Sequence, residues 1–229
     1  MIDVLRRETL PREIYIARPP RGLKFSAIEL QQITISILVL ALAFTILFSD
    51  PLSRTTSLDY FARIFAISLA AVVTGFLFHE LAHKVLAQKY GCWAEYRMSP
   101  FGLLFALMTA MFGFVFAAPG AVHISGHITK EQSGKISIAG PLTNVAVGGP
   151  FLALAFLFAF TASDWAQIPW FIAFINLLLA GFNMIPFPPF DGSKVVYWSK
   201  AYYVLALVLI GSLFAMVWFF GEVLILLGL

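Results

Sequence analysis

The stretch His79-Glu-Leu-Ala-His83 lies in an otherwise apolar run that begins near Ile64 and predicts a membrane-spanning helix. A spacing of four residues places both imidazoles on one helical face, with Glu80 beside the first. An ionised side chain at mid-bilayer costs about 2.5 to 3.5 kcal/mol, so these ionisable groups need a compensating partner. A bound metal cation would be that partner, with His79 and His83 as ligands and Glu80 free to act on water.

The composition of the chain favours a membrane protein before any motif is considered. Of its 229 residues, 60% are hydrophobic and 12% are charged, which reverses the balance of a soluble surface. The single cysteine, Cys92, excludes a thiolate zinc cluster, so a metal must be held by nitrogen and oxygen. The net charge of +3 is spread over loops beside apolar segments, which indicates membrane topology. We therefore expect the lipid bilayer, and no nucleic acid, as a partner.

Residues 1–26 differ from the rest of the chain in holding six basic residues and three prolines. This composition predicts a cytosolic segment at the membrane surface. It is not typical of a secretory signal, because the following apolar run is too long and lacks a small-residue cleavage site. We expect residues 27–229 to form a single membrane-embedded domain, with its core at 60–200, in a multi-pass protein of a prokaryotic cell membrane.

Apolar segments separated by breaks predict an all-α polytopic membrane protein with about five to six transmembrane segments, a short membrane-associated β element and broken helices around the site. Residues 50–53 predict a turn. Pro141 suits a first helical turn, so we expect a helix to begin near Gly140 and Gly148-Gly-Pro150 to interrupt it. The predicted helices cover 27–48, 61–90, 140–160, 169–185 and 201–229.

The apolar segment 101–118 either crosses the membrane or re-enters it. The positive-inside rule favours no crossing, because only Arg54 and Arg63 then lie on the side opposite the N-terminal basic cluster. The flanking segments 94–98 and 121–125 alternate between apolar and polar residues, which predicts short strands near the membrane face.

Three motifs follow one another in separate apolar segments: His79-Glu-Leu-Ala-His83, Gly140-Pro-Leu-Thr-Asn144, and Asn183-x-x-Pro186-x-x-x-x-Asp191-Gly192. In order and spacing they resemble the site-2 protease family of intramembrane zinc metalloproteases, of the archaeal type without a PDZ domain. The resemblance covers roughly residues 60 to 200. Ala82 stands where many members carry glycine, and we expect this to affect helix packing rather than metal binding. The segment 101–118 has no clear counterpart in the family pattern.

The resemblance implies a Zn²⁺ ion held by His79, His83 and Asp191. Coordination chemistry independently favours the same three ligands. Catalytic zinc usually takes three ligands from the protein, and two histidines with one carboxylate are a known combination. Glu80 is then the general base, which takes a proton from water and later passes it to the leaving amine. Asn144 is expected to contact the oxyanion or the substrate backbone, and Asn183 to brace the Asp191 loop.

The implied function is hydrolysis of peptide bonds in locally unwound transmembrane segments of other proteins. A rise of about 1.5 Å per residue places His79 roughly 27 Å from Phe61, so cleavage is expected near the cytosolic leaflet. A helical substrate must unwind to expose its amide bonds, and a strand at 119–124 could hold it by β-augmentation. The sequence predicts no oligomeric state.

Other interpretations of these residues stay open at this point. A membrane metal transporter or sensor could use the same histidines and Asp191 without breaking a bond, and Glu80 is the residue that distinguishes the two. Asp191 could be a turn residue before Gly192, and Asn144 a helix cap. His123 and His127 also share the four-residue spacing, but Ser125 and Gly126 between them disfavour a helix, so we expect loop histidines.

Overall fold

In a computed structural model, residues 23–49, 57–161 and 164–227 of the chain are described. The turn predicted at 50–53, and most of the segment predicted as cytosolic at 1–26, lie outside these residues. The elements in chain order are α1 (Ala27–Ser49), α2 (Leu58–Val72), a π-helical turn (Val73–Leu77), α3 (Phe78–Lys89), β1 (Trp93–Met98), α4 (Pro100–Ala110), β2 (Gly120–Ser125), α5 (Lys130–Phe160), a 3₁₀ turn (Asp164–Ala166), α6 (Gln167–Asn183), α7 (Asp191–Trp198) and α8 (Lys200–Leu227).

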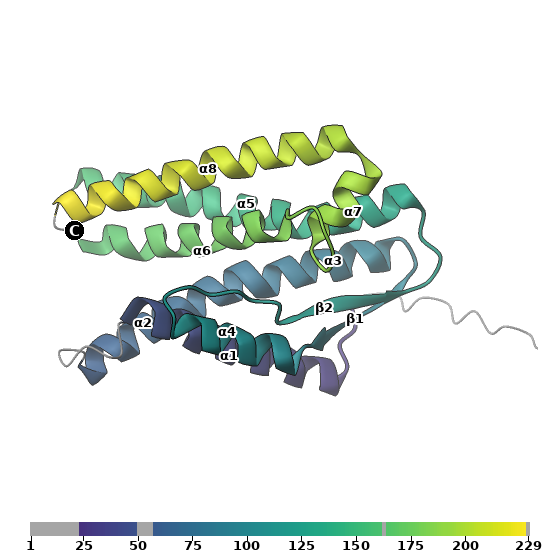
Figure 1. The fold of residues 1–229 in the computed structure, drawn as a ribbon, viewed down its shortest axis with the longest axis horizontal. Helices are drawn as coiled ribbons and strands as arrows, with labels where there is room; N and C mark the ends of the chain where they lie inside the picture. Colours follow the sequence, from purple (N-terminus) through teal and green to yellow (C-terminus); the bar gives the residue numbers. More distant parts are fainter. Residues whose placement is uncertain (1–22, 50–56, 162–163, 228–229) are drawn as a thin grey trace, which may run out of the picture.

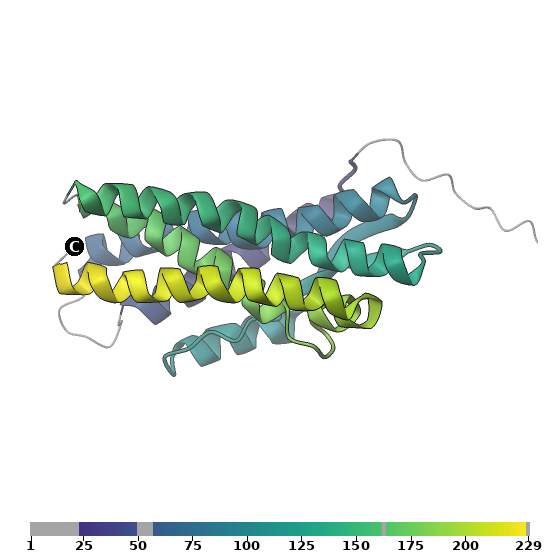
Figure 2. The ribbon, with the colours of Figure 1, turned by 90° about the horizontal axis from the view of Figure 1, so that it is seen from above.

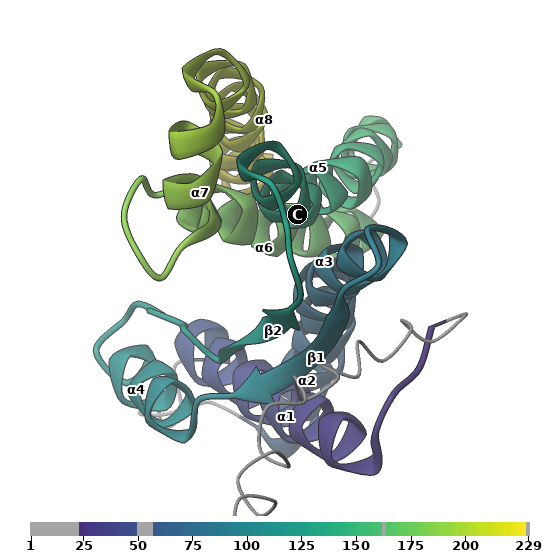
Figure 3. The same ribbon diagram turned by 90° about the vertical axis from the view of Figure 1, so that its right-hand side faces the viewer.

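The helices run along one common axis in two layers (Figure 1). One layer holds α5, α6 and α8, and the other holds α1, α2 and α3 with α4 and the two strands at its margin, as the view along the axis shows (Figure 3). Within the described residues, four helices are long and apolar enough to cross a membrane: α1, the continuous helix 58–89, α5 and α8. The predicted all-α membrane fold with a small β element is confirmed, while the count of five to six spans stays a prediction.

The start predicted for α5 was wrong by ten residues, because the helix begins at Lys130 and not at Gly140. A capping box fixes this earlier start: the Thr129 hydroxyl accepts from the Gln132 backbone N–H at 3.1 Å, and the Gln132 side chain accepts from the Thr129 N–H at 2.8 Å. The interruption predicted at Gly148-Gly-Pro150 was also wrong. Both internal prolines remove a backbone hydrogen bond, but α5 packs against α3, α6 and α7, and this packing keeps it continuous.

The helix after α3 is too short to cross a membrane by itself. The 11 residues of α4 span only about 16 Å, roughly half of a 30 Å hydrocarbon core. The chain returns through 111–119 to β2, and α4 lies along the margin of the bundle (Figure 2). Strands β1 and β2 pair antiparallel, from Trp93 opposite Ser125 to Met98 opposite Gly120, which confirms both predicted strands.

The predicted break after α6 is present, since the chain leaves helical structure at Met184 and resumes it at Asp191. The short helix α7 was not predicted. It follows three prolines and has eight residues, too few to show a clear periodicity. A Cβ on Gly192 would collide with the main-chain carbonyl of Met184, so only glycine allows the start of α7 to pack this closely on the end of α6.

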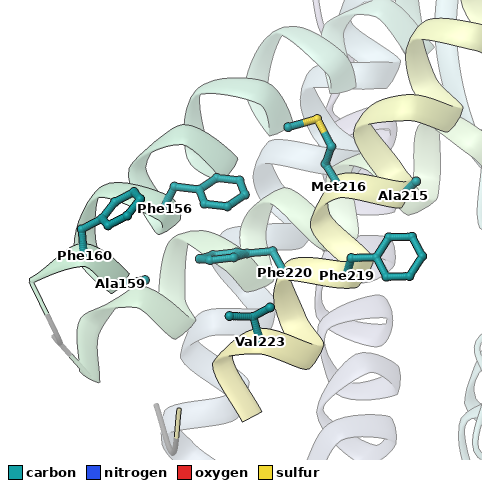
Figure 4. A pocket seen from close by; sticks show the side chains of 8 residues that line it. All are labelled: Phe156, Ala159, Phe160, Ala215, Met216, Phe219, Phe220 and Val223. Atoms are coloured by element: carbon teal, nitrogen blue, oxygen red, sulfur yellow. The ribbon is translucent and has the colours of Figure 1, made fainter. Parts of the chain in front are cut away.

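An apolar cavity of about 540 Å³ lies between α5 and α8, near the ends that are remote from the histidine motif (Figure 4). Its lining residues are all apolar: Phe156, Ala159, Phe160, Ala215, Met216, Phe219, Phe220 and Val223. Such a lining suits contact with lipid and supplies no group for metal binding or acid–base chemistry.

A buried ion pair joins α1 to the helix that carries the histidines. The Lys84 ammonium donates to both carboxylate oxygens of Glu29 at 2.6 Å, and the two side chains are only 2% and 1% exposed. Glu29 also accepts from the Tyr96 backbone N–H at 2.9 Å. One carboxylate thereby holds α1, α3 and β1 in a fixed arrangement.

We predict that Lys84→Met destabilises the protein by about 3 to 5 kcal/mol, because it leaves the Glu29 carboxylate buried and unpaired. The double variant with Glu29→Gln should recover much of this loss. Thermal unfolding in detergent measures both. Lys135→Met, which removes an exposed pair with Glu131, is the control and should leave the midpoint nearly unchanged. Equal midpoints for Lys84→Met and Lys135→Met would contradict the prediction.

Candidate metal centre

Two elements bring three metal-binding side chains together. His79 and His83 project from α3, and Asp191 is the first residue of α7. The Asp191 Oδ2 atom lies 3.2 Å from His79 Nε2 and 3.0 Å from His83 Nε2. The ligand atoms of all three lie within 4.8 Å of one another, and no second group of this kind occurs among the described residues. The structure thus places the three predicted ligands in one spot.

The Nδ1 atom of each imidazole, which is not the atom that faces Asp191, also has a hydrogen-bond partner. His83 Nδ1 donates to the main-chain carbonyl of Ile136 at 2.7 Å, and His79 Nδ1 contacts Asn144 Oδ1 at 2.6 Å. A carbonyl oxygen can only accept, so the proton of His83 is on Nδ1 and the lone pair is on Nε2. Such contacts behind a metal ligand fix its tautomer and orientation.

The space in front of the two Nε2 atoms is kept open by a glycine. A Cβ on Gly140 would lie 2.5 Å from His79 Nε2 and 2.6 Å from His83 Nε2. Because Gly140 has no side chain, this space remains available to an ion. Two imidazole nitrogens and one carboxylate oxygen suit Zn²⁺ and leave a fourth position for water, so the residues present fit zinc.

Asp191 is suited to be an anionic ligand. Burial alone would raise the pKa of Asp191, but without the ion the charge of a protonated His83 and hydrogen bonds from both imidazoles hold that pKa well below its ordinary value. With the ion bound, its own positive charge would act on the carboxylate in the same direction. The side chain therefore stays ionised at neutral pH. Together with the close packing at Gly192, this favours the ligand interpretation of Asp191 over that of a simple turn residue.

Glu80 lines the pocket that also contains the metal-binding group. The side chain is 9% exposed, and its Oε2 atom has no hydrogen-bond partner among the described residues. The backbone of Val122 lies beside its carboxylate. The pocket has a volume of about 290 Å³ and is also lined by both histidines and Asp191. A carboxylate oxygen placed in this way can take a proton from a water molecule bound at the ion.

Asn144 is held by contacts within the protein, and its predicted contact with the oxyanion or the substrate backbone stays a prediction. It is fully buried, and its amide nitrogen donates to the Gly75 carbonyl at 2.7 Å and to Asn176 Oδ1 at 3.3 Å. Both amide hydrogens are thus engaged, and the oxygen holds His79. Asn183 lines the pocket and donates to the Leu179 carbonyl at 2.9 Å, so bracing of the Asp191 loop stays a prediction.

Two polar residues, one behind the site and one in its pocket, were not predicted from the sequence. Asn176 is fully buried on the apolar helix α6, where an isolated amide is itself a signal. Lys194 lines the pocket one turn after Asp191, and that spacing could have identified it.

His123 lies in β2 opposite Glu95, and not in a loop as expected, while His127 follows the strand. Both are exposed and neither belongs to the metal-binding group.

Known proteins similar to this chain are named as zinc metalloproteases. MJ0611 of Methanocaldococcus jannaschii is 44% identical over 202 residues, which cover 85% of this chain and 98% of that protein. Rip3 of Mycobacterium tuberculosis is 32% identical over 55% of this chain and 28% of its own length. YwhC of Bacillus subtilis is 29% identical, over 55% of this chain and 65% of its own length. No family model and no solved structure matches the chain.

We predict that Gly140→Ala weakens zinc binding by roughly 100-fold or more, because the added methyl group occupies the space faced by both Nε2 atoms. Metal analysis and competition with a chelator measure the effect. Gly149→Ala is the matched control, since a Cβ there meets nothing within 4 Å on the same helix, and it should bind zinc normally. Normal zinc content in Gly140→Ala would place the ion elsewhere.

Proposed function

The chain belongs to the site-2 protease family of zinc metalloproteases, and from that premise we propose that it hydrolyses peptide bonds of transmembrane segments inside the membrane, near the cytosolic leaflet. The observation that carries this proposal is the meeting of His79, His83 and Asp191 within a bundle of membrane-length helices. An unpartnered Glu80 oxygen lies in the adjoining pocket.

The proposed chemistry assigns one task to each side chain. His79, His83 and Asp191 hold zinc, which when bound lowers the pKa of water and polarises a carbonyl group. Glu80 Oε2 accepts the proton of the attacking water and later gives it to the leaving amine. The buried contacts at Asn144 and Ile136 keep both imidazoles aimed at the ion while the proton moves.

The depth of the site supports cleavage near one membrane face. His79 lies roughly 32 Å along the helix from Leu58 and about 15 Å from its other end at Lys89. The elements at that end carry most of the described basic residues, whereas Arg63 lies toward the opposite end (Figure 1). The positive-inside rule makes the end near the site cytosolic. The basic residues at this end are Lys24, Lys84, Lys89, Arg97, Lys130, Lys135, Lys194 and Lys200.

The free edge of β2 supports a binding mode for the substrate. β1 covers only one edge of β2 in the two-stranded sheet. Residues Gly120, Val122 and Ile124 line the pocket together with Glu80 and Asp191. A substrate helix that has unwound could pair with this edge and thereby present a peptide bond to the metal-binding group. Transmembrane helices weakened by glycine or proline are the substrates that unwind most easily.

We predict that Glu80→Gln binds zinc as tightly as the unchanged protein but loses at least about 100-fold of its peptide-bond cleavage, because the amide cannot accept the proton. Metal analysis and cleavage of single-span peptides in detergent measure the two properties. Glu222→Gln, an exposed change on α8, is the control. A variant that cleaves normally would exclude Glu80 as the base, and loss of zinc would make it a ligand, which the transporter interpretation allows and the protease interpretation does not.

We predict that Ile124→Pro slows cleavage of a transmembrane peptide by about tenfold, because proline removes a backbone donor on the edge of β2 that faces the pocket. Ile124→Val preserves the donor and should behave normally. Zinc content is measured alongside and should not change in either variant. Unchanged cleavage by a zinc-loaded Ile124→Pro protein would rule out pairing at this position of the edge.

A further inference from the structure

We propose that Asn176 on α6 is a positioning residue for the metal ligand His79 and that it acts through Asn144. The proposal rests on the proposed role of His79 as a zinc ligand. Asn176 touches neither the metal-binding group nor the pocket that surrounds it, but it belongs to a chain of buried hydrogen bonds that ends at the imidazole of His79.

The contacts of Asn176 and Asn144 form a continuous relay. Asn176 Nδ2 donates to the Ile172 carbonyl at 2.9 Å and to Thr74 Oγ1 at 3.1 Å. Asn176 Oδ1 accepts from Asn144 Nδ2 at 3.3 Å, and Asn144 Oδ1 lies 2.6 Å from His79 Nδ1. Both asparagines are fully buried, so water does not compete for these bonds.

The relay has only one direction, because main-chain carbonyls fix the orientation of both amides. The Ile172 carbonyl can only accept, so the Asn176 nitrogen faces it and the Asn176 oxygen faces Asn144. The Gly75 carbonyl holds the Asn144 nitrogen in the same way at 2.7 Å. The Asn144 oxygen must then face His79, whose Nδ1 donates to it. The lone pair of His79 is therefore left on Nε2, the atom that faces Asp191 and the ion.

Loss of the Asn176 oxygen would remove one of the two acceptors that keep Asn144 in this orientation. If the Asn144 amide turns over, its nitrogen faces His79 Nδ1 and favours the tautomer with the proton on Nε2. That tautomer has its lone pair on Nδ1 and none on Nε2, the atom that faces the metal-binding group. The physical task of Asn176 is thus to maintain the tautomer of His79.

The local backbone explains why α6 can take part. Thr74 and Gly75 lie in the π-helical turn Val73–Leu77, where the regular bonding of the helix is interrupted just before the histidine motif. A Cβ on Gly75 would lie 2.9 Å from the Leu179 side chain, so glycine permits close packing of α6 against this turn. The relay thereby ties α6, which supplies none of the three proposed ligands, to the orientation of His79.

The test is the zinc dissociation constant of the full chain in detergent, measured by competition with a chelator. Asn176→Leu keeps a similar shape but removes all of its side-chain hydrogen bonds, and we expect zinc binding to weaken by roughly 10- to 100-fold. Trp170→Phe is the matched control, because it removes a bond from α6 to the Val217 carbonyl remote from the site. This control should bind zinc normally.

A double-variant cycle separates positioning from general destabilisation. In an Asn144→Ala background the relay is already cut, so adding Asn176→Leu should cause no further loss of zinc affinity. Additive losses, or normal zinc binding by Asn176→Leu, would overturn the inference. If Asn176→Leu does not fold, Thr74→Val removes one bond of the relay, and we expect a severalfold loss from it; normal affinity would again contradict the proposal.

His79→Ala distinguishes this inference from the proposed function. If His79→Ala binds zinc as tightly as the unchanged chain, the ligand assignment itself fails. If His79→Ala loses zinc while Asn176→Leu keeps it, the ligand assignment stands and only the positioning role of Asn176 is refuted.

Discussion

The Nε2 atoms of His79 and His83 and one carboxylate oxygen of Asp191 must face the same point inside a membrane-embedded bundle, and much of the structure serves this requirement. One helical turn supplies both imidazoles from α3. The break after α6 returns the chain so that α7 begins at Asp191. Gly140 leaves the space in front of the nitrogens empty. A zinc metalloprotease of this kind is therefore assembled from segments far apart in the sequence but adjacent in the bundle.

Burial among membrane-length helices imposes a second constraint, because polar groups there have few partners other than one another. Lys84 pairs with Glu29, and Asn176 pairs with Asn144 and Thr74. Glu80 differs from these groups, since its Oε2 atom has no partner among the described residues. The groups that fix positions are thus paired, whereas one oxygen of the carboxylate proposed to move a proton has no partner.

The sequence predicted those features that long apolar runs and local chemistry determine, and it failed where distant segments meet. The first two helices, both strands and the break after Asn183 were predicted correctly. The start of α5 was misplaced because the preference of Pro141 for a first turn was weighed above the capping box at Thr129 and Gln132. The contact of Asn144 with His79, and any role of Asn176, depend on helix packing that a sequence pattern does not contain.

The ligands of the ion can be identified by zinc K-edge X-ray absorption on the purified protein. We expect a coordination shell of nitrogen and oxygen atoms with the scattering pattern of two imidazoles, and no sulfur. His83→Ala should lose one imidazole contribution, and Asp191→Ala one oxygen or the ion itself. A sulfur ligand in the protein, or an unchanged coordination shell in both variants, would show that His83 and Asp191 do not hold the ion.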